Sequence, residues 1–448
     1  MSSSSSAQEG ILFEGNELGV GTRAMGMGGA YIGVSDDYSA LYWNPAGLGQ
    51  LRRTEINIGF SHNLFSNNAT YLNNENTEQT SFSRLNSLGL VLPVPTYQGS
   101  IVFAIGYNKF KDYNSSLVAS AFNPKQSVFN WDHAFYDEDF IEQYYNTTIN
   151  DSLYQTQNIL IDGGLNQWSI GGSIEVQKDF YLGASLNFIS GKRDYNYKFE
   201  EEDVNNIYNL YNPEDNLSND LDLYRYEFNT YSKITATNFK LASFYRMGSL
   251  VRIGATITLP TTFTFKEDWD DAETVYFDTV TDLWPKFVGS DEYKIEQPYS
   301  FAAGASVKFL NFMFSGDLEY QDWSQTKFKT DPPVDYLSKA DINRYIREDL
   351  KDVTKIRLGA EMFIPLLNAR ARAGFYRLPS PYKIAENDID RNYVSAGASF
   401  LLDKQVMVDF GWVRGAWKDK SWIEELSQEI INQELAYNKF VGTLSLRF

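Results

Sequence analysis

Apolar and polar residues alternate along much of this chain, in segments of about ten residues each. Residues 312–320 place phenylalanine, leucine and tyrosine on one face, and serine, aspartate and glutamate on the other. A period of two predicts β-strands that each have one apolar and one polar face. The same pattern recurs in 251–259, where the apolar face is Val251, Ile253, Ala255, Ile257, Leu259 and the polar face is Arg252, Gly254, Thr256, Thr258.

The predicted strands form hairpins with very short turns, and long connections separate one hairpin from the next. An even number of strands, with short turns at one rim and long loops at the other, is typical of bacterial outer-membrane barrels. The sequence therefore predicts an all-β fold, an antiparallel transmembrane β-barrel of about fourteen strands. The strands are expected at Glu55–Leu64, Leu85–Val94, Ser100–Phe110, Gln167–Gln177, Phe180–Tyr197, Tyr224–Arg246, Leu250–Lys266, Tyr299–Phe309, Phe312–Lys329, Lys355–Ile364, Ala369–Leu378, Asn392–Leu402, Val406–Trp417 and Tyr437–Phe448.

Composition agrees with a membrane barrel. Aromatic residues make up 16% of the 448 residues, and membrane barrels use such residues in girdles at the two interfaces. No run of 18 or more apolar residues would form a transmembrane helix. The terminal Phe448 shares a face with Phe440, Leu444 and Leu446, which resembles the signal read by the outer-membrane insertion machinery. Two helices are expected in the long connections, at 341–350 and at 421–431.

Charge and residue counts exclude several functions. The net charge of −19 argues against nucleic-acid binding, which needs a basic face. The absence of cysteine excludes disulfides, thiol catalysis and cysteine-bound metal. Only His62 and His133 could serve a histidine-based site, and we see no Ser-His-Asp/Asn arrangement on neighbouring strands. We therefore expect no enzyme activity, no metal and no cofactor.

The N-terminal segment differs from the rest, because Gly19–Gln50 is rich in glycine and shows no strand pattern. Met1 and five serines precede it without an apolar signal core, which we interpret as an artificial or processed N-terminus. We predict a tail and plug, or hatch, at 1–53 and the barrel at 54–448. Gly26, Gly28 and Gly29 lack the Lys-Ser/Thr of a phosphate loop, so close packing inside the barrel explains them better.

Charged residues on the polar strand faces allow two interpretations. Asp36 and Asp37 are expected to cap a turn or to pair with an arginine of the lumen. The lumen charges would either form an ion-pair network that anchors the hatch or supply an arginine for a ligand carboxylate. The lumen residues concerned are Arg252, Asp317, Glu319, Arg357, Arg370 and Arg372.

Aromatic residues crowd two of the long connections, and they too have two interpretations. They would form either the core of a loop cap or a groove that captures a hydrophobic ligand. The residues concerned are Phe122, Phe129, Trp131, Phe135 and Phe140 in one connection, and Trp284 and Phe287 in another.

The N-terminal segment resembles the hatch of the FadL family, outer-membrane transporters of long-chain fatty acids and aromatic hydrocarbons. The resemblance implies a fourteen-stranded barrel in which loops capture an apolar ligand and pass it to an inner pocket. The hatch then shifts, and the ligand leaves sideways through a gap at a kinked third strand, here near Gly106. The residues that carry the resemblance are Arg23-Ala24, Met25–Ala30, Asp36-Asp37, Ser39-Ala40 and the Asn44-Pro45-Ala46-Gly47 motif.

We therefore expect passive transport across the outer membrane of a Gram-negative bacterium. The ligand would be a hydrophobic small molecule or lipid, and the lipopolysaccharide layer would be its surroundings. Burial of each CH₂ group is worth about 0.8 kcal/mol, which supplies a driving force without ATP. An alternative is a barrel that binds cargo proteins, like the FadL-related shuttle of the type IX secretion system, so a protein partner stays open. An outer-membrane phospholipase is a third and less favoured class.

Overall fold

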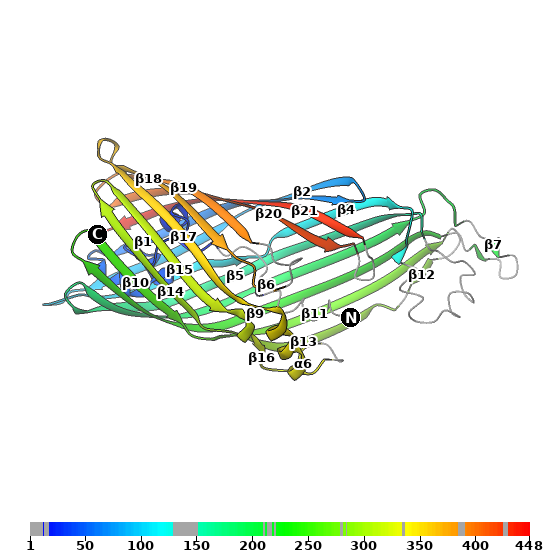
Figure 1. Ribbon diagram of the computed structural model, residues 1–448, viewed down its shortest axis with the longest axis horizontal. Helices are drawn as coiled ribbons and strands as arrows, with labels where there is room; N and C mark the ends of the chain where they lie inside the picture. Colours follow the sequence, from blue (N-terminus) through cyan, green and yellow to red (C-terminus); the bar gives the residue numbers. More distant parts are fainter. Residues whose placement is uncertain are drawn as a thin grey trace.

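The computed structural model describes residues 12, 18–128, 151–208, 211–212, 217–218, 221–277, 281–283, 285–333, 337–383, 390–423 and 429–448. Its main feature is a closed antiparallel β-barrel with fourteen wall positions (Figure 1). The barrel closes because β1 pairs on one side with β2 and on the other with β21. This confirms the predicted fold class and strand number.

Most wall positions are single strands, and three are each made of two segments in line. The wall consists of β1 (Glu55–Tyr71), β2 (Asn74–Val94), β3 (Ile101–Asp112) with β4 (Ser115–Asn123), β5 (Leu153–Gln177), β6 (Phe180–Glu202), β9 (Leu221–Met247), β10 (Val251–Thr258) with β11 (Thr261–Phe277), β14 (Ser300–Phe309) with β13 (Phe287–Gln297), β15 (Phe312–Asp322), β17 (Asp352–Ile364), β18 (Ala369–Leu378), β19 (Arg391–Leu401), β20 (Val406–Trp422) and β21 (Ile430–Arg447). Short β12 (Thr281–Leu283) and β16 (Lys327–Phe328) pair antiparallel with β11 and β13, and β7 (Tyr211–Asn212) pairs with β8 (Leu217–Ser218).

Two local predictions had different outcomes. Helix α6 (Lys339–Asp349) confirms the helix expected at 341–350, and Ser338 caps it by accepting a bond from the Asp341 amide. The helix expected at 421–431 is wrong at both ends. Trp422 ends β20 and pairs with Ile430 of β21, because the cross-strand ladder outweighs the local capping pattern.

The strands run farther than their apolar pattern predicted. The region 65–84 was expected to be a connection, yet β1 and β2 continue to a tight turn at Leu72 and Asn73, both with positive φ. Beyond Leu64 the outward side chains of β1 are polar, so the pairing continues where no lipid needs to be contacted. The alternation therefore marks the membrane-spanning part of each strand, and the hairpins extend beyond it.

The two faces of the wall agree with the predicted alternation. On β15 the outward residues Phe314 and Leu318 are exposed, whereas the inward Ser315 and Asp317 are buried. On β10 Ile253 and Ile257 are exposed, and Thr256 is buried. Apolar residues therefore face outward and polar residues face the lumen, as a lipid-embedded barrel requires. Among the described residues, no helix is long and apolar enough to cross a membrane.

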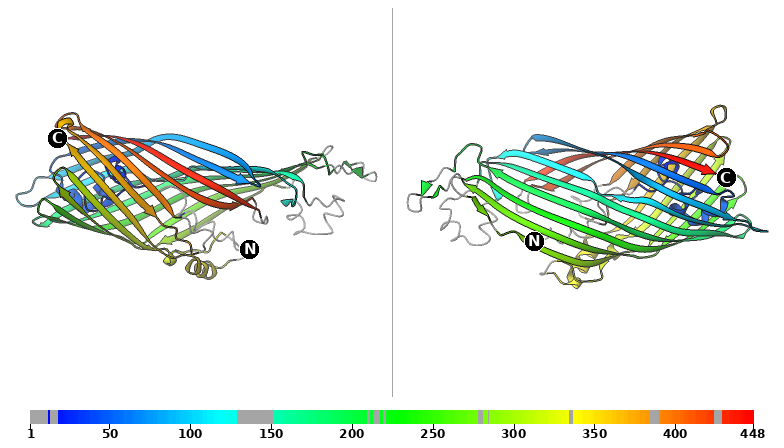
Figure 2. Two further views of the ribbon diagram at one scale, coloured as in Figure 1. Left: turned by 45° about the horizontal axis from the view of Figure 1, so that its top comes forward. Right: turned by 180° about the vertical axis from the view of Figure 1, so that it is seen from behind.

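The N-terminal segment 18–51 lies inside the barrel, at the end that carries the short turns and the C-terminus (Figures 1 and 2). It contains α2 (Thr22–Gly26), α3 (Ala40–Trp43) and the 3₁₀ helix η1 (Pro45–Gln50). Helix α2 packs against β18, β19 and β20, and η1 packs against β5, β6 and β9. Two apolar clusters fill the lumen beyond it, one containing Phe263, Phe265 and Tyr293 and one around Tyr71 and Phe199.

Candidate functional site

The hatch backbone rests directly on the barrel backbone at Gly28. A Cβ atom at this position would lie 2.5 Å from the backbone nitrogen of Phe375, and the φ of 64° also favours glycine. On the barrel side, a Cβ at Gly374 would lie 2.0 Å from the Gly28 nitrogen. The Gly28 amide donates to Ser395 Oγ at 2.9 Å. Close packing therefore accounts for this glycine. A Cβ at Gly26 would lie 3.3 Å from Gly397 Cα of the wall, and one at Gly29 would lie 2.9 Å from Trp43 and 3.0 Å from Arg357.

A buried ion-pair network joins the hatch to the wall through Arg23. Its Nε and Nη2 atoms donate to the two oxygens of Glu361, at 2.8 and 2.9 Å. Arg372 also donates to Glu361, at 2.7 Å, and pairs with Asp409 at 2.8 Å. Arg370 reaches Glu361 at 3.3 Å. One carboxylate thus binds three guanidinium groups at the contact between hatch and wall.

Asp36 and Asp37 share the hydroxyl of Tyr31, at 3.4 and 2.6 Å, and otherwise have different partners. Asp36 pairs with Arg23 and, at 2.9 Å, with Arg252 of β10. Burial alone would raise the pKa of Asp36, but these two guanidinium groups outweigh burial and hold that pKa well below its usual range. Asp37 accepts bonds from the amide and the hydroxyl of Ser39, which forms a local turn cap.

Asp317 of β15 holds the middle of the hatch. Its Oδ2 atom accepts bonds from the backbone amides of Tyr31 and Ile32, at 2.6 and 2.8 Å. Arg357 pairs with Glu319 at 2.8 Å and lies over the rings of Trp43 and Tyr376. The predicted lumen charges are thus gathered beside the hatch, on β10, β15, β17 and β18 of one continuous part of the wall.

The Asn44-Pro45-Ala46 motif forms the exit of the hatch. The side-chain amide of Asn44 donates to the carbonyls of Ile32 and of Ser243 in β9, at 3.2 and 3.1 Å. Its oxygen accepts from the Ala46 amide at 3.1 Å, and Pro45 begins η1, where no amide donor is needed. The chain then enters β1 at Glu55.

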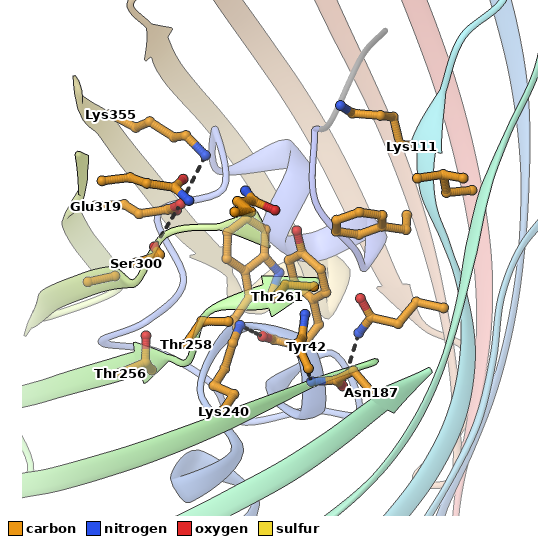
Figure 3. Close-up of a pocket in the computed structure, with 18 of the residues that line it drawn as sticks. Tyr42, Lys111, Asn187, Lys240, Thr256, Thr258, Thr261, Ser300, Glu319 and Lys355 are labelled. Atoms are coloured by element: carbon orange, nitrogen blue, oxygen red, sulfur yellow. Dashed lines mark hydrogen bonds and ion pairs between the residues drawn. The ribbon is translucent and has the colours of Figure 1, made fainter. Parts of the chain in front are cut away.

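A cavity of about 100 Å³ lies in the lumen between the hatch and the first apolar cluster (Figure 3). Trp43 and Tyr42 of the hatch form one side, and Phe110, Tyr113 and Phe263 add apolar surface. Leu12, Ile32 and Leu165 also line it, together with the polar wall residues Gln167, Asn187, Asn238, Thr256, Thr258, Thr261 and Ser300. The cavity therefore has a mixed lining, whereas the resemblance implies an apolar inner pocket.

Cations surround this cavity. Lys240 donates to the carbonyl of Tyr42 at 2.6 Å, and Lys111 donates to the carbonyl of Leu12 at 2.5 Å. Lys355 and Arg357 share Glu319, which is the one carboxylate among the described lining residues. Of the predicted lumen charges, only Glu319 and Arg357 line the cavity. Lys240 was missed although alternation along its strand placed it on the inward face, whereas Lys111 was expected in a connection and faces inward because of the register shift between Lys109 and Lys111.

The wall beside the cavity is interrupted at the third position. The β2–β3 ladder ends at the pair Ser87–Asn108, and within the described residues no ladder joins Asn74–Asn86 of β2 to β4. Side chains bridge this seam instead. The side-chain amide of Asn74 donates to the carbonyl of Ser120, and the side-chain oxygen of Asn76 accepts a bond from the Ser120 backbone amide. Thr80 Oγ1 lies 3.2 Å from Ser116 Oγ. We call this stretch the β2–β4 seam.

An ion pair closes the lower end of the seam. Arg84 of β2 contacts Asp112 Oδ1 at 2.8 Å and donates to Asn114 Oδ1 at 2.7 Å. The third strand bends here, with a register shift between Lys109 and Lys111 and with positive φ at Gly163 and Gly164 on the facing β5. The wall is therefore discontinuous at Lys109–Asn114.

Gly106 does not lie at this interruption. It pairs with Gly89 of β2 and with Ser169 of β5 in unbroken ladders. A Cβ at Gly106 would lie 2.0 Å from Tyr38 Oη, and one at Gly89 would lie 1.8 Å from Tyr38 Cε2. The two glycines thus form a socket for the ring of Tyr38, and the expected kink lies a few residues farther along β3.

The aromatic loop residues are only partly described. Phe122 lies near the end of β4 and Phe287 begins β13, and both are exposed. These strands lie on non-adjacent wall positions, so the two rings are not neighbours along the wall. Phe129, Trp131, Phe135, Phe140 and Trp284 lie outside the described residues.

The structure contains one serine–histidine pair that was not predicted from the sequence. His62 Nδ1 lies 2.9 Å from Ser83 Oγ, on directly paired positions of β1 and β2. In a serine hydrolase Nε2 faces the nucleophile and Nδ1 faces an acidic group, so this pair has a different arrangement. In the described part of the chain, no group of three or more His, Cys, Asp and Glu residues is placed to hold a metal ion.

The fold and its lumen define a plugged outer-membrane β-barrel, in which a folded N-terminal segment stands beneath a cavity. The sequence model of the family described as "Outer membrane protein transport protein (OMPP1/FadL/TodX)" matches residues 4–442. The chain therefore belongs to the FadL/TodX family of outer-membrane transport proteins of Gram-negative bacteria. No curated protein matches it.

Solved structures share the fold at low sequence identity. A crystal structure of the Pseudomonas putida toluene transporter TodX matches with a TM-score of 0.59 and 13% identity, over 97% of this chain and 99% of that one. A Pseudomonas aeruginosa FadL homologue matches with 0.62 and 12%, over 97% and 100%. The Ralstonia pickettii toluene transporter TbuX matches with 0.52 and 13%, over 97% and 99%.

Proposed function

We propose that this protein lets hydrophobic molecules cross the outer membrane without an energy source. A ligand enters from the loop side, occupies the cavity above the hatch, and leaves sideways after the hatch moves, at the lower end of the β2–β4 seam, where Arg84 contacts Asp112. The single observation that carries the proposal is the position of the cavity. Its lining includes Phe110 and Tyr113, which lie on the bent stretch of chain where β3 ends and the wall is discontinuous.

The size of the cavity favours a small ligand. An engineered apolar cavity of about 150 Å³ binds benzene, so a cavity of about 100 Å³ needs further space even for one aromatic ring. Moving the side chain of Leu12, which lines the cavity, would enlarge it. The toluene transporters among the structural neighbours suggest an aromatic hydrocarbon. A long-chain fatty acid would require a much larger displacement of the hatch.

The experiment uses the absence of cysteine in this chain. Thr80→Cys with Ser116→Cys places two thiols across the β2–β4 seam, where the native oxygens lie 3.2 Å apart. The variant is expressed in Gram-negative cells that lack transporters of this kind, and entry of labelled toluene and oleate is measured. Oxidation is expected to stop uptake, and a reductant is expected to restore it.

The matched control is Asn57→Cys with Ser445→Cys. These two residues are bonded at 3.0 Å across the continuous β1–β21 ladder, so their disulfide closes no opening. Undiminished uptake through the oxidised seam variant would refute the sideways exit. Faster entry of toluene than of oleate would assign an aromatic cargo, and the reverse would assign fatty acids.

A ligand carboxylate, where the ligand has one, would face Lys240 rather than Arg370 or Arg372. Arg372 is fully buried against Glu361, Asp409 and Ser399, and neither arginine lines the cavity. Lys240→Gln is expected to slow oleate and to leave toluene unchanged, and Lys233→Gln on the outer face of β9 is the control. Equal losses for both ligands would reject a carboxylate site at Lys240.

The alternative, a barrel that binds a cargo protein, predicts an unbroken wall or a lumen open to a protein segment. The interrupted wall and the hatch inside the lumen favour a small molecule instead.

A further inference from the structure

A second pocket lies outside the transport route, at the rim that carries the short turns. It has a volume of about 300 Å³ and lies between the β17–β18 turn, the β19–β20 turn and the C-terminal strand. Short turns of outer-membrane barrels face the periplasm, so this rim lies at the level of the inner-leaflet headgroups. The lining residues are Arg53, Phe363, Asn368, Arg370, Ser399, Leu401, Lys404, Gln405, Met407 and Arg447.

The charge of this pocket contrasts with the rest of the protein. Among the described residues, its lining holds Arg53, Arg370, Lys404 and Arg447 and no carboxylate, in a chain whose net charge is −19. Asp403 belongs to the same turn, but it is not part of the lining and accepts a bond from the Lys404 amide. Four cations therefore converge on one concave site from four separate parts of the chain.

The cations are incompletely neutralised by their neighbours. Arg447 Nε donates to Glu55 at 2.9 Å, but its Nη2 atom is buried and has no hydrogen-bond partner. Arg370 reaches Glu361 at 3.3 Å, and that carboxylate also serves Arg23 and Arg372. The pocket thus retains donors and positive charge that an anion would satisfy.

Arg53 and Lys404 are held together although both are cationic. Arg53 Nη1 lies 3.5 Å from the carbonyl of Lys404, and the Arg447 amide donates to Gln405 O at 2.8 Å. These backbone contacts fix the turn against the C-terminal strand. The site is therefore formed before a ligand arrives.

Apolar side chains also lie on the outer face of this rim. Phe400 and Phe448 are exposed there, whereas Phe363 and Leu401 line the pocket on the same strand faces as Arg370 and Ser399. Acyl chains would contact Phe400 and Phe448 while a charged headgroup reaches over the rim to the cations. This combination of a basic pocket and an apolar border matches an anionic lipid better than a free ion.

We propose that this pocket binds the phosphate of an anionic lipid from the periplasmic leaflet of the outer membrane. The bound lipid would lie against the strands β17–β21, whose inner faces hold the Arg23–Glu361 contact of the hatch. Pocket binding is independent of the cargo and of its exit route.

The test is native mass spectrometry of the purified protein in detergent, titrated with phosphatidylglycerol or phosphatidylethanolamine. We expect tighter binding of phosphatidylglycerol. Each cation near a membrane surface contributes roughly five-fold in affinity, so Arg53→Gln with Lys404→Gln should weaken phosphatidylglycerol binding by about 25-fold. These two exposed residues are not part of the hatch contacts, and correct folding is checked by the heat-modifiable electrophoretic mobility of the barrel.

The matched control is Lys178→Gln with Arg52→Gln, which removes two cations from the same rim on another part of the wall. An equal loss in this control, or equal affinity for the two lipids, would overturn the proposal. Displacement of the lipid by millimolar inorganic phosphate would identify a site for free anions and would also overturn it.

Discussion

The socket for Tyr38 allows the attachment of the hatch to be tested with a single methyl group. Gly106→Ala would place a Cβ atom 2.0 Å from Tyr38 Oη and 2.5 Å from Cε2, far inside contact distance. Tyr38 must then leave the socket, where its hydroxyl lies 3.0 Å from Asn108 Oδ1 and 3.1 Å from the carbonyl of Leu88.

The cost follows from these contacts. Overpacking typically costs about 1–3 kcal/mol, and the lost hydroxyl hydrogen bond adds about 0.5–1.5 kcal/mol. A total of about 2–4 kcal/mol corresponds to roughly a 30- to 700-fold increase in local opening. The amide of Tyr38, which donates to Glu55 Oε1 at 3.1 Å, is a direct reporter of that opening.

The assay is hydrogen exchange of residues 18–51, measured by mass spectrometry in detergent. Gly442→Ala is the matched control, because its Cβ would find its nearest neighbours at 4.0 Å. Adding Tyr38→Ala to Gly106→Ala should restore the thermal stability of the barrel while the hatch still exchanges fast. Unchanged exchange around Tyr38 in Gly106→Ala, or an equal increase in Gly442→Ala, would refute the socket.

Three further predictions concern the hatch network and the cavity. Glu361→Gln leaves the buried guanidinium groups around it short of a carboxylate and should destabilise the protein by about 3–5 kcal/mol in thermal unfolding, whereas the exposed Glu292→Gln should leave thermal unfolding almost unchanged. Because the folded-state pKa of Asp36 is depressed, its ion pairs stabilise the hatch at every pH above the unfolded value of about 3.9 and are lost only as the pH falls through the folded value. Asp36 should therefore contribute no step to hatch exchange between pH 8 and pH 5, and a step in that window that disappears in Asp36→Asn would contradict the Asp36 pairing. Thr256→Leu adds side-chain volume to the cavity and should slow uptake while hatch exchange stays unchanged, whereas full uptake would argue against the cavity as the route.

The alternation of apolar and polar residues predicted most of the fold, because a period of two can be recognised from adjacent residues alone. It correctly placed Leu318 toward lipid and Asp317 toward the lumen. It failed beyond the membrane, at residues 65–84, because a strand without lipid contact has no need of an apolar face. It also could not locate the interruption of the wall at Lys109–Asn114, which depends on lost pairing with β2 rather than on any residue of β3 alone.

The site was predictable in its residue types but not in its contacts. The charges of the polar face could be read from the chain, and so could the presence of arginine partners for Asp36. The partner of Tyr38 could not, because Gly89 and Gly106 meet only after two strands pair. Lys240 was missed for the same reason, since alternation gives the inward face but the stagger of the barrel sets the depth at which a side chain projects.

The strands differ greatly in length, and this difference sets how the mouth of the protein meets its surroundings (Figure 2). The 27 residues of β9 extend about 90 Å along the strand, and a tilt of about 40° reduces this to about 70 Å along the membrane normal. The 10 residues of β18 give about 25 Å, which only matches the hydrocarbon layer. One side of the barrel therefore stands roughly 40 Å taller than the other in its strands. A molecule that diffuses parallel to the cell surface, within the sugar layer, is stopped by this taller side of the barrel. The rate at which such molecules reach the mouth therefore depends on the height of that side as well as on the width of the pore.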